Sequence, residues 1–187
     1  MGHVSQFDLG QIIATYGTTV FLETGTYQGS SLRHAAQFGF HRLISIEADP
    51  DLAARVAGDF RDDPRVAIHV GDSLQWLPKV LDALSDVYSL CCWLDAHYPA
   101  GPAVTELPLL QELGLLAAYP GFRASVILID DRRIYENDAY TSGGLPGGYA
   151  QGDGRALIDF EDRIAPSHVV ERSTIGEGTI AFYPRHA

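Results

Sequence analysis

Short apolar, β-branched runs alternate along the chain with longer segments of helical periodicity. The strand-like runs cover residues 20–23, 43–47, 66–70, 87–94 and 125–130. Between them, apolar residues return at spacings of three and four, which predicts helices over residues 30–38, 50–60, 73–84 and 106–119. The runs are apolar on both faces, so we expect both faces to be buried. Such alternation is typical of a mostly parallel sheet with helices on both sides.

The end of the chain has a different pattern. Two strand-like runs, 167–172 and 179–183, are separated by Gly176-Glu177-Gly178, which predicts an antiparallel hairpin. We expect a helix over residues 155–164 to cover the sheet, and an opening helix over residues 7–16 to pack on its edge.

The fold class predicted from these elements is α/β. We expect a doubly wound, Rossmann-like, mostly parallel seven-stranded sheet with a C-terminal antiparallel hairpin, in one domain spanning residues 1–187. The glycine-rich segment 141–154 is too poor in apolar residues to form a packed element, so we expect a mobile loop. It can serve as a lid over an acceptor site or as a plain connection.

Composition narrows the range of partners. The chain is 46% hydrophobic, enough for one continuous core, and its 13 Lys and Arg against 24 Asp and Glu give a formal charge of −11. Such a charge repels phosphate backbones and anionic lipid surfaces, so neither nucleic acid nor membrane is an expected partner. No apolar run is long enough to cross a bilayer and the first ten residues lack a secretory pattern, which predicts a cytoplasmic protein.

Both cysteines, Cys91 and Cys92, are adjacent within one strand-like run. Successive strand side chains point to opposite faces, so these two predict neither a disulfide scaffold nor a zinc site. We expect both to pack in the core.

A loop with two glycines follows the first strand. The strand ends in Glu23, and the chain passes Gly25 and Gly29 before a helix opens near Ser30. Bare backbone permits a tight turn and the close approach of a ligand. The third glycine of a nicotinamide-cofactor fingerprint is missing, and an ordinary strand-to-helix turn would look the same.

Acidic residues also end the next two strands. Glu47 closes the second strand, where a carboxylate can accept the protons of two ribose hydroxyls, and Gly71-Asp72-Ser73 follows the third. Ligands of open α/β sheets collect at these carboxyl ends. Taken singly, either acid can instead cap a helix or face solvent.

Together, ETGTYQGS, Glu47 in IEAD and Asp72 in GDS resemble the class I S-adenosylmethionine-dependent methyltransferases, over nearly the whole chain. The resemblance implies that Glu23 lies beneath the methionine part of S-adenosylmethionine, that Glu47 holds the ribose, and that the GDS region borders the adenine. The implied cofactor-binding residues are Glu23, Gly25, Thr26, Tyr27, Gly29, Ser30, Glu47, Asp72 and Ser73.

Three carboxylates follow the fourth and fifth strands: Asp95, Asp130 and Asp131. If these strands are neighbours, the carboxylates crowd together, and repulsion is relieved by protons or by a cation. Mg²⁺ (or Mn²⁺), bound by one or two carboxylates, waters and substrate oxygens, would suit the position. The alternative is that they cap the next helix or face water.

This acidic set resembles metal-dependent O-methyltransferases, both the catechol and caffeoyl-CoA type and the macrocin and mycinamicin sugar type. The resemblance implies that Asp95, Asp130 and Asp131 bind or adjoin the metal. Asp131 departs from the Asn usual in the first type, and His97 departs from the second carboxylate favoured in the other. Neither type therefore specifies the acceptor.

The predicted function is metal-assisted O-methyl transfer to a small hydroxylated molecule. His97 is the candidate base, acting beside Asp95 as the second catalytic residue, although a surface histidine fits equally. Tyr98 can line the acceptor pocket or only pack, and Arg132, Arg133 and Tyr135 can bind substrate or face solvent. Alternative functions are an NAD(P)-dependent oxidoreductase and a non-catalytic S-adenosylmethionine- or metal-binding module; homo-oligomers are possible in each case.

Overall fold

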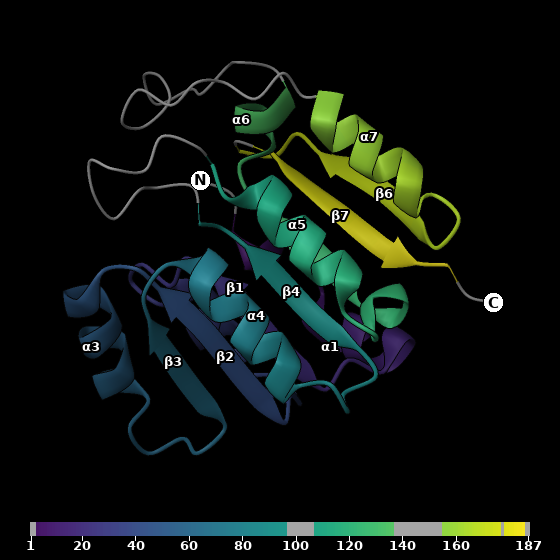
Figure 1. Cartoon of the computed structure of the whole chain (residues 1–187). Helices are drawn as coiled ribbons and strands as arrows, with labels where there is room; N and C mark the ends of the chain where they lie inside the picture. The colour runs from purple at the N-terminus through teal and green to yellow at the C-terminus, as the bar shows by residue number, and fades with distance from the viewer. Residues whose placement is uncertain (1–2, 97–106, 137–154, 177, 186–187) are drawn as a thin grey trace.

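Seven strands form one sheet in the order β3-β2-β1-β4-β5-β7-β6 (Figure 1). The computed structural model describes residues 3–96, 107–136, 155–176 and 178–185. The strands are β1 (Val20–Thr24), β2 (Arg42–Glu47), β3 (Val66–Val70), β4 (Leu90–Leu94), β5 (Val126–Ile129), β6 (His168–Ser173) and β7 (Thr179–Pro184). The first five run parallel, while β7 is antiparallel to both β5 and β6. The predicted fold class is confirmed.

Helices cover both faces of this sheet. They are α1 (Leu9–Tyr16), α2 (Ser30–Ala35), α3 (Pro50–Asp59), α4 (Ser73–Ala83), α5 (Leu109–Ala118), α6 (Arg132–Glu136) and α7 (Arg155–Ile164), with short 3-10 helices η1 (Val4–Gln6) and η2 (Phe122–Ala124). Figure 1 shows α4, α5 and α7 in front of the sheet. Cys92 packs in the core on that side, and Cys91 packs with Leu9 of α1 and Leu32 of α2 on the other. The two cysteines occupy opposite faces of the core, as predicted.

The opening helix differs from the prediction. It packs on a face of the sheet rather than on its edge, because Leu9 and Ile12 share a buried cluster with Trp93 of the central strand β4. The helix starts after Asp8, whose carboxylate accepts a hydrogen bond from the backbone N–H of Gln11 at 2.9 Å. This cap sets the start at residue 9 instead of residue 7.

Burial on both faces is confirmed for β1, β4 and β5, but the prediction is wrong for β3. β3 is an edge strand, and its Ala67 and Val70 are exposed. β4 also begins later than predicted, at Leu90, because the N–H of Val87 donates to the carbonyl of Leu84 at 2.8 Å in a turn after α4.

The hairpin of β6 and β7 is as predicted, with Gly176 and Gly178 at φ 65° and 83°. The short helix α6 was not predicted. The predicted helix start at residue 106 and the predicted loop 141–154 lie outside the described residues. None of the helices among the described residues is long and apolar enough to cross a membrane.

Candidate cofactor and acceptor site

The carboxyl ends of four neighbouring strands are in register at one edge of the sheet. Thr24 of β1 lies beside Ile46 of β2 and Leu94 of β4, and Leu94 lies beside Ile129 of β5. The next residues continue the ladder: the N–H groups of Gly25, Asp95 and Asp130 donate to the carbonyls of Ile46, Thr24 and Leu94 at 2.9, 2.9 and 3.1 Å. The fold thus brings Glu47, Gly25, Asp95 and Asp130 into one row across the sheet.

Only glycine fits at Gly25 in this row. Its φ is 83°, and a Cβ added there would lie 2.5 Å from the carbonyl oxygen of Asp95. Gly29, at φ 74°, is equally restricted, because a Cβ would lie 2.7 Å from Cγ1 of Val56 on α3. The backbone of the loop between these glycines therefore packs directly against its neighbours.

Tyr27 lies at the tip of this loop with a left-handed backbone, at φ 47°. Its N–H donates to Oε2 of Glu47 at 2.6 Å, and the N–H of Asp49 donates to Oε1 of Glu47 at 2.9 Å. The Tyr27 side chain is 56% exposed, whereas Glu47 is buried. Glu47 therefore fixes the loop tip to the end of β2.

Glu23 is fully buried beneath the loop. Its two carboxylate oxygens accept hydrogen bonds from Ser31 at 2.5 Å and from Ser45 at 2.7 Å, and the Ser45 hydroxyl also contacts that of Thr26. Burial raises the pKa of Glu23 to about 7, although both serine hydrogen bonds oppose the shift. Ser45, a buried polar residue in an apolar strand, was missed in the sequence, although its position between Ile44 and Ile46 was a signal.

Asp72 acts as the N-cap of α4, the alternative recognised in the sequence. Its Oδ1 accepts a hydrogen bond from the N–H of Leu74 at 2.8 Å, and its side chain is exposed. Next to it, Gly71 packs on Trp76, since a Cβ there would lie 2.8 Å from the indole nitrogen. Ser73 is buried at the start of α4, and Ser30 is exposed at the start of α2.

Both aspartates after β5 are buried. Asp130 and Asp131 are 1% and 0% exposed, so the alternative that this pair faces water is wrong. Asp95 is partly buried and accepts a hydrogen bond from the Trp93 indole at 3.3 Å. Among the described residues, no three acidic, histidine or cysteine side chains lie close enough together to hold one metal ion. Successive side chains along a strand point to opposite faces, and the backbone of Asp131 is left-handed, at φ 49°. The side chains of Asp130 and Asp131 therefore point in different directions.

Tyr135 of α6 lies within electrostatic range of all these aspartates. Its pKa is raised well above its usual value, first by burial and then by the negative charges of Glu112, Asp95, Asp131 and Asp130. Glu112, on α5, is buried and was missed in the sequence. It lies within the apolar stripe of Leu109, Leu113 and Leu116, and a charge in such a stripe was the available signal.

This chain resembles known proteins in its structure and not in its sequence. No family model and no curated protein matches the sequence. The S-adenosylhomocysteine-bound methyltransferase PaMTH1 of Podospora anserina superimposes with a TM-score of 0.61 at 15% identity, covering 94% of this chain and 76% of that one. The O-methyltransferase of Bacillus cereus, also bound to S-adenosylhomocysteine, gives 0.54 at 17% identity, with coverages of 94% and 78%. The chain has the same fold as these two methyltransferases.

The same fold also occurs in a protein whose name indicates a different reaction. Spermidine synthase of Thermotoga maritima matches with a TM-score of 0.60 at 14% identity, over 96% of this chain and 57% of that one. The fold alone therefore does not determine the reaction, which has to be argued from the site.

Three of the predicted acceptor-site residues cannot be placed. The described residues do not include His97, Tyr98 or the side chain of Arg133. Arg132 is described, and its backbone N–H donates to the carbonyl of Gly178 at 3.1 Å.

Proposed function

We propose that this chain is an S-adenosylmethionine-dependent methyltransferase that methylates a hydroxyl group of a small molecule. The observation that carries the proposal is the row of Glu47, Gly25, Asp95 and Asp130 across four adjacent strand ends. At one side of the row, the glycine loop that begins at Gly25 lies beside the carboxylate of Glu47. At the other side lie the two acidic residues Asp95 and Asp130. The S-adenosylhomocysteine bound in two structures of the same fold supports the assignment of the cofactor.

The residues of the loop fit this cofactor. Gly25 and Gly29 allow close approach of the methionine part, and Glu47 offers lone pairs beyond those used by Tyr27 and Asp49 to the ribose hydroxyls. The exposed Tyr27 ring and Asp72 would flank the ligand on its open side. We assign Thr26, Ser30 and Ser73 to the same site, above the buried support of Glu23.

The acceptor would bind beside Asp95 and Asp130. S-adenosylmethionine supplies an electrophilic methyl group on its sulfonium. The chain must hold the acceptor oxygen in line with that methyl and take up the hydroxyl proton. We propose that His97, two residues after Asp95, removes the proton and that Asp95 orients the acceptor.

We further propose that a divalent cation, Mg²⁺ or Mn²⁺, assists while bound to one or two of the three carboxylates of Asp95, Asp130 and Asp131. Mg²⁺ typically needs only one or two carboxylates and takes its remaining ligands from water and substrate. A hard cation would also offset the charge that Asp130 and Asp131 bring into a buried site. A bound cation would lower the hydroxyl pKa of the acceptor.

An NAD(P)-dependent oxidoreductase is disfavoured by two positions of the loop. In the G-x-G-x-x-G pattern that begins at Gly25, Tyr27 and Ser30 occupy the places of the second and third glycines. A non-catalytic binding module would bind S-adenosylmethionine without turnover. Calorimetry with S-adenosylhomocysteine and NAD distinguishes the cofactor classes.

A transfer assay distinguishes an enzyme from a binding module. Methyl-labelled S-adenosylmethionine, supplied with a panel of hydroxylated metabolites with and without Mg²⁺, should label at least one acceptor. Asp95→Asn should lower the rate at least tenfold, and Asp62→Asn, on the exposed surface, should not. Cofactor binding without transfer to any hydroxylated compound would favour the module.

A further inference from the structure

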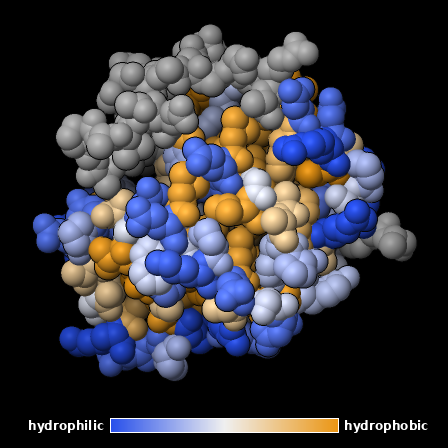
Figure 2. Space-filling model, in the orientation of Figure 1, coloured by the Kyte–Doolittle hydropathy of each residue, from blue (hydrophilic) through white to orange (hydrophobic). Residues whose placement is uncertain are grey.

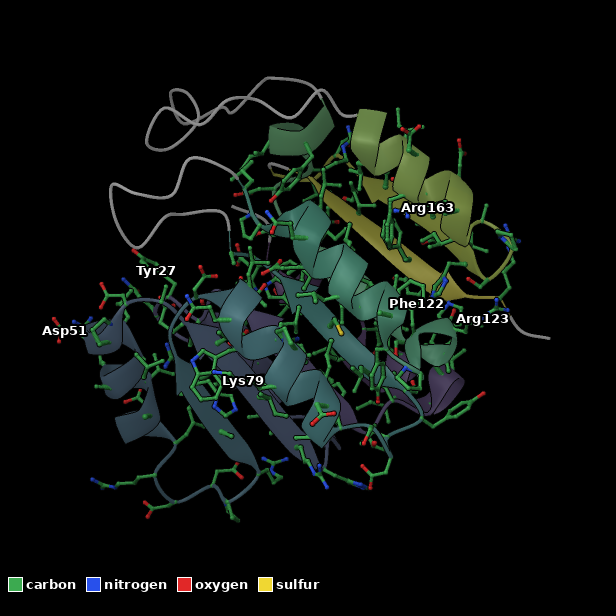
Figure 3. All side chains as sticks on the ribbon, viewed as in Figure 1. Tyr27, Asp51, Lys79, Phe122, Arg123 and Arg163 are labelled. Carbon is green, nitrogen blue, oxygen red and sulfur yellow. The ribbon has the colours of Figure 1, made fainter. Side chains whose placement is uncertain are left out.

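A pocket lies at the end of the sheet opposite the glycine loop. It has a volume of about 280 Å³, is open to solvent, and is lined by the end of α5, the short helix η2 and the end of α7. η2 leads directly into the amino end of β5, whereas the cofactor loop follows the carboxyl end of β1. Figure 3 shows this separation, with Tyr27 at the left of the view and Phe122 and Arg123 at the right.

The floor of this pocket is aromatic and aliphatic. Tyr119, Phe122, Phe160 and Ile164 contribute to it, and each is buried. The Tyr119 hydroxyl donates to the carbonyl of Leu84 at 2.8 Å, so it is directed into the protein rather than toward the pocket. Each of these side chains exposes only a small part of its surface, so the floor offers the apolar body of a ligand a small area of contact. In the space-filling view of Figure 2, apolar surface is visible on the same side of the molecule, over the region of α5.

Two arginines stand at the rim. Arg123 comes from η2 and Arg163 from α7, and the guanidinium of Arg163 lies 5.3 Å from the centre of the Phe160 ring. Both arginines are exposed, and within the described part of the chain neither forms an ion pair. Four other arginines there pair with carboxylates, namely Arg33, Arg61, Arg65 and Arg172, whereas Arg42, Arg55 and Arg185 form no ion pair either.

Two exposed guanidinium groups thus line one pocket, in a chain that has 24 acidic residues and only 13 basic ones. The carboxyl end of a helix favours a cation, which accounts for Arg163 in the last turn of α7. It does not account for Arg123, which belongs to a three-residue helix. The neighbouring His168 adds no positive charge near neutrality, because burial lowers its pKa.

We propose that this pocket binds a small organic carboxylate. The apolar body would rest on Phe122 and Phe160, and the carboxylate would be held between the guanidinium groups of Arg123 and Arg163, whose planar donors match its geometry. The volume is slightly below the range of about 300–1,000 Å³ common for ligand sites, which suits a compact molecule. The site is separate from the methyl-transfer site, and the proposal does not depend on the proposed function.

Ligand-observed NMR on the full chain tests the proposal with three probes: benzoate, neutral benzyl alcohol and inorganic phosphate. Benzoate should bind at least tenfold more tightly than either of the others. Arg123→Gln and Arg163→Gln should each weaken benzoate binding at least tenfold. The control Arg61→Gln removes an exposed guanidinium outside the pocket and should leave binding unchanged.

Three results would overturn the proposal. Absence of benzoate binding would remove the site, and equal affinity for phosphate and benzoate would show that charge alone is recognised. Unchanged benzoate affinity in both pocket variants would place the ligand elsewhere. Because Arg123 and Arg163 are exposed, both variants should fold, and their thermal transitions verify this.

Discussion

The carboxylate of Glu47 accepts a hydrogen bond of 2.6 Å from the backbone N–H of Tyr27. This contact joins the tip of the glycine loop to the end of β2, and it keeps Tyr27 in a left-handed conformation that is uncommon outside glycine. The carboxylate proposed to bind ribose is thus also the group that shapes the loop. Loss of Glu47 should disturb both.

The buried carboxyl group of Glu23 makes stability depend on pH. Its pKa is about 7 in the folded protein against an ordinary value of 4.5, so between these limits the folded state holds more protons than the unfolded state. The contribution of Glu23 to stability is therefore complete below pH 4.5 and is lost as pH rises through 7. At about 1.4 kcal/mol per pKa unit, the loss amounts to a few kcal/mol.

Glu23→Gln should therefore gain stability relative to the native chain as pH rises from 5 to 8. Urea unfolding at several pH values measures the difference, with Glu171→Gln, an exposed position on β6, as control. Parallel pH curves for Glu23→Gln and the native chain would show that Glu23 does not titrate in this range.

Steric exclusion at Gly25 gives a second prediction. Gly25→Ala places a methyl 2.5 Å from the Asp95 carbonyl oxygen, so the backbone of the loop or of β4 must move. Gly17→Ala is the matched control, because Gly17 has a similar φ of 64° and open space around it. The control should lose only about 1 kcal/mol of unfolding free energy, the cost of left-handed backbone for alanine. Gly25→Ala should lose more and should bind S-adenosylhomocysteine at least tenfold less tightly; equal losses in the two variants would refute the close packing.

The cation proposal is tested by binding as well as by turnover. Mn²⁺ should bind to the native chain, as followed by its electron paramagnetic resonance signal, and Asp130→Asn should weaken that binding at least tenfold. Asp62→Asn, at an exposed position, should not. Chelation should stop methyl transfer, and Mg²⁺ should restore it. Full transfer activity after exhaustive metal removal would show that the buried aspartates serve another purpose.

Much of this architecture was predictable because the strand and helix periodicities are local. Residues 20–23 and 125–130 were predicted as buried strands, and β1 and β5 are buried in the sheet. The edge position of β3 was not predictable, since the order of strands depends on pairing between distant segments.

In the candidate site, the sequence predicted the residue types that end each strand, but not what each side chain contacts. The helix cap formed by Asp72 was one of two roles foreseen for it, whereas Ser31 and Ser45, which hold the buried carboxylate of Glu23, were both missed. Glu112 joins the acidic region only because α5 packs in one core cluster with the ends of β4 and β5. Such long-range contacts leave little trace in local periodicity.

The central claim is that this edge of the sheet binds S-adenosylmethionine through Glu47. Isothermal titration of S-adenosylhomocysteine into the native chain and into Glu47→Ala tests it most directly, with NAD as the comparison ligand. The native chain should bind S-adenosylhomocysteine and not NAD, and the variant should bind about 1 to 3 kcal/mol more weakly, the usual loss for hydrogen bonds to a charged group. Binding of NAD in place of S-adenosylhomocysteine, or equal affinity in the native chain and the variant, would contradict the account.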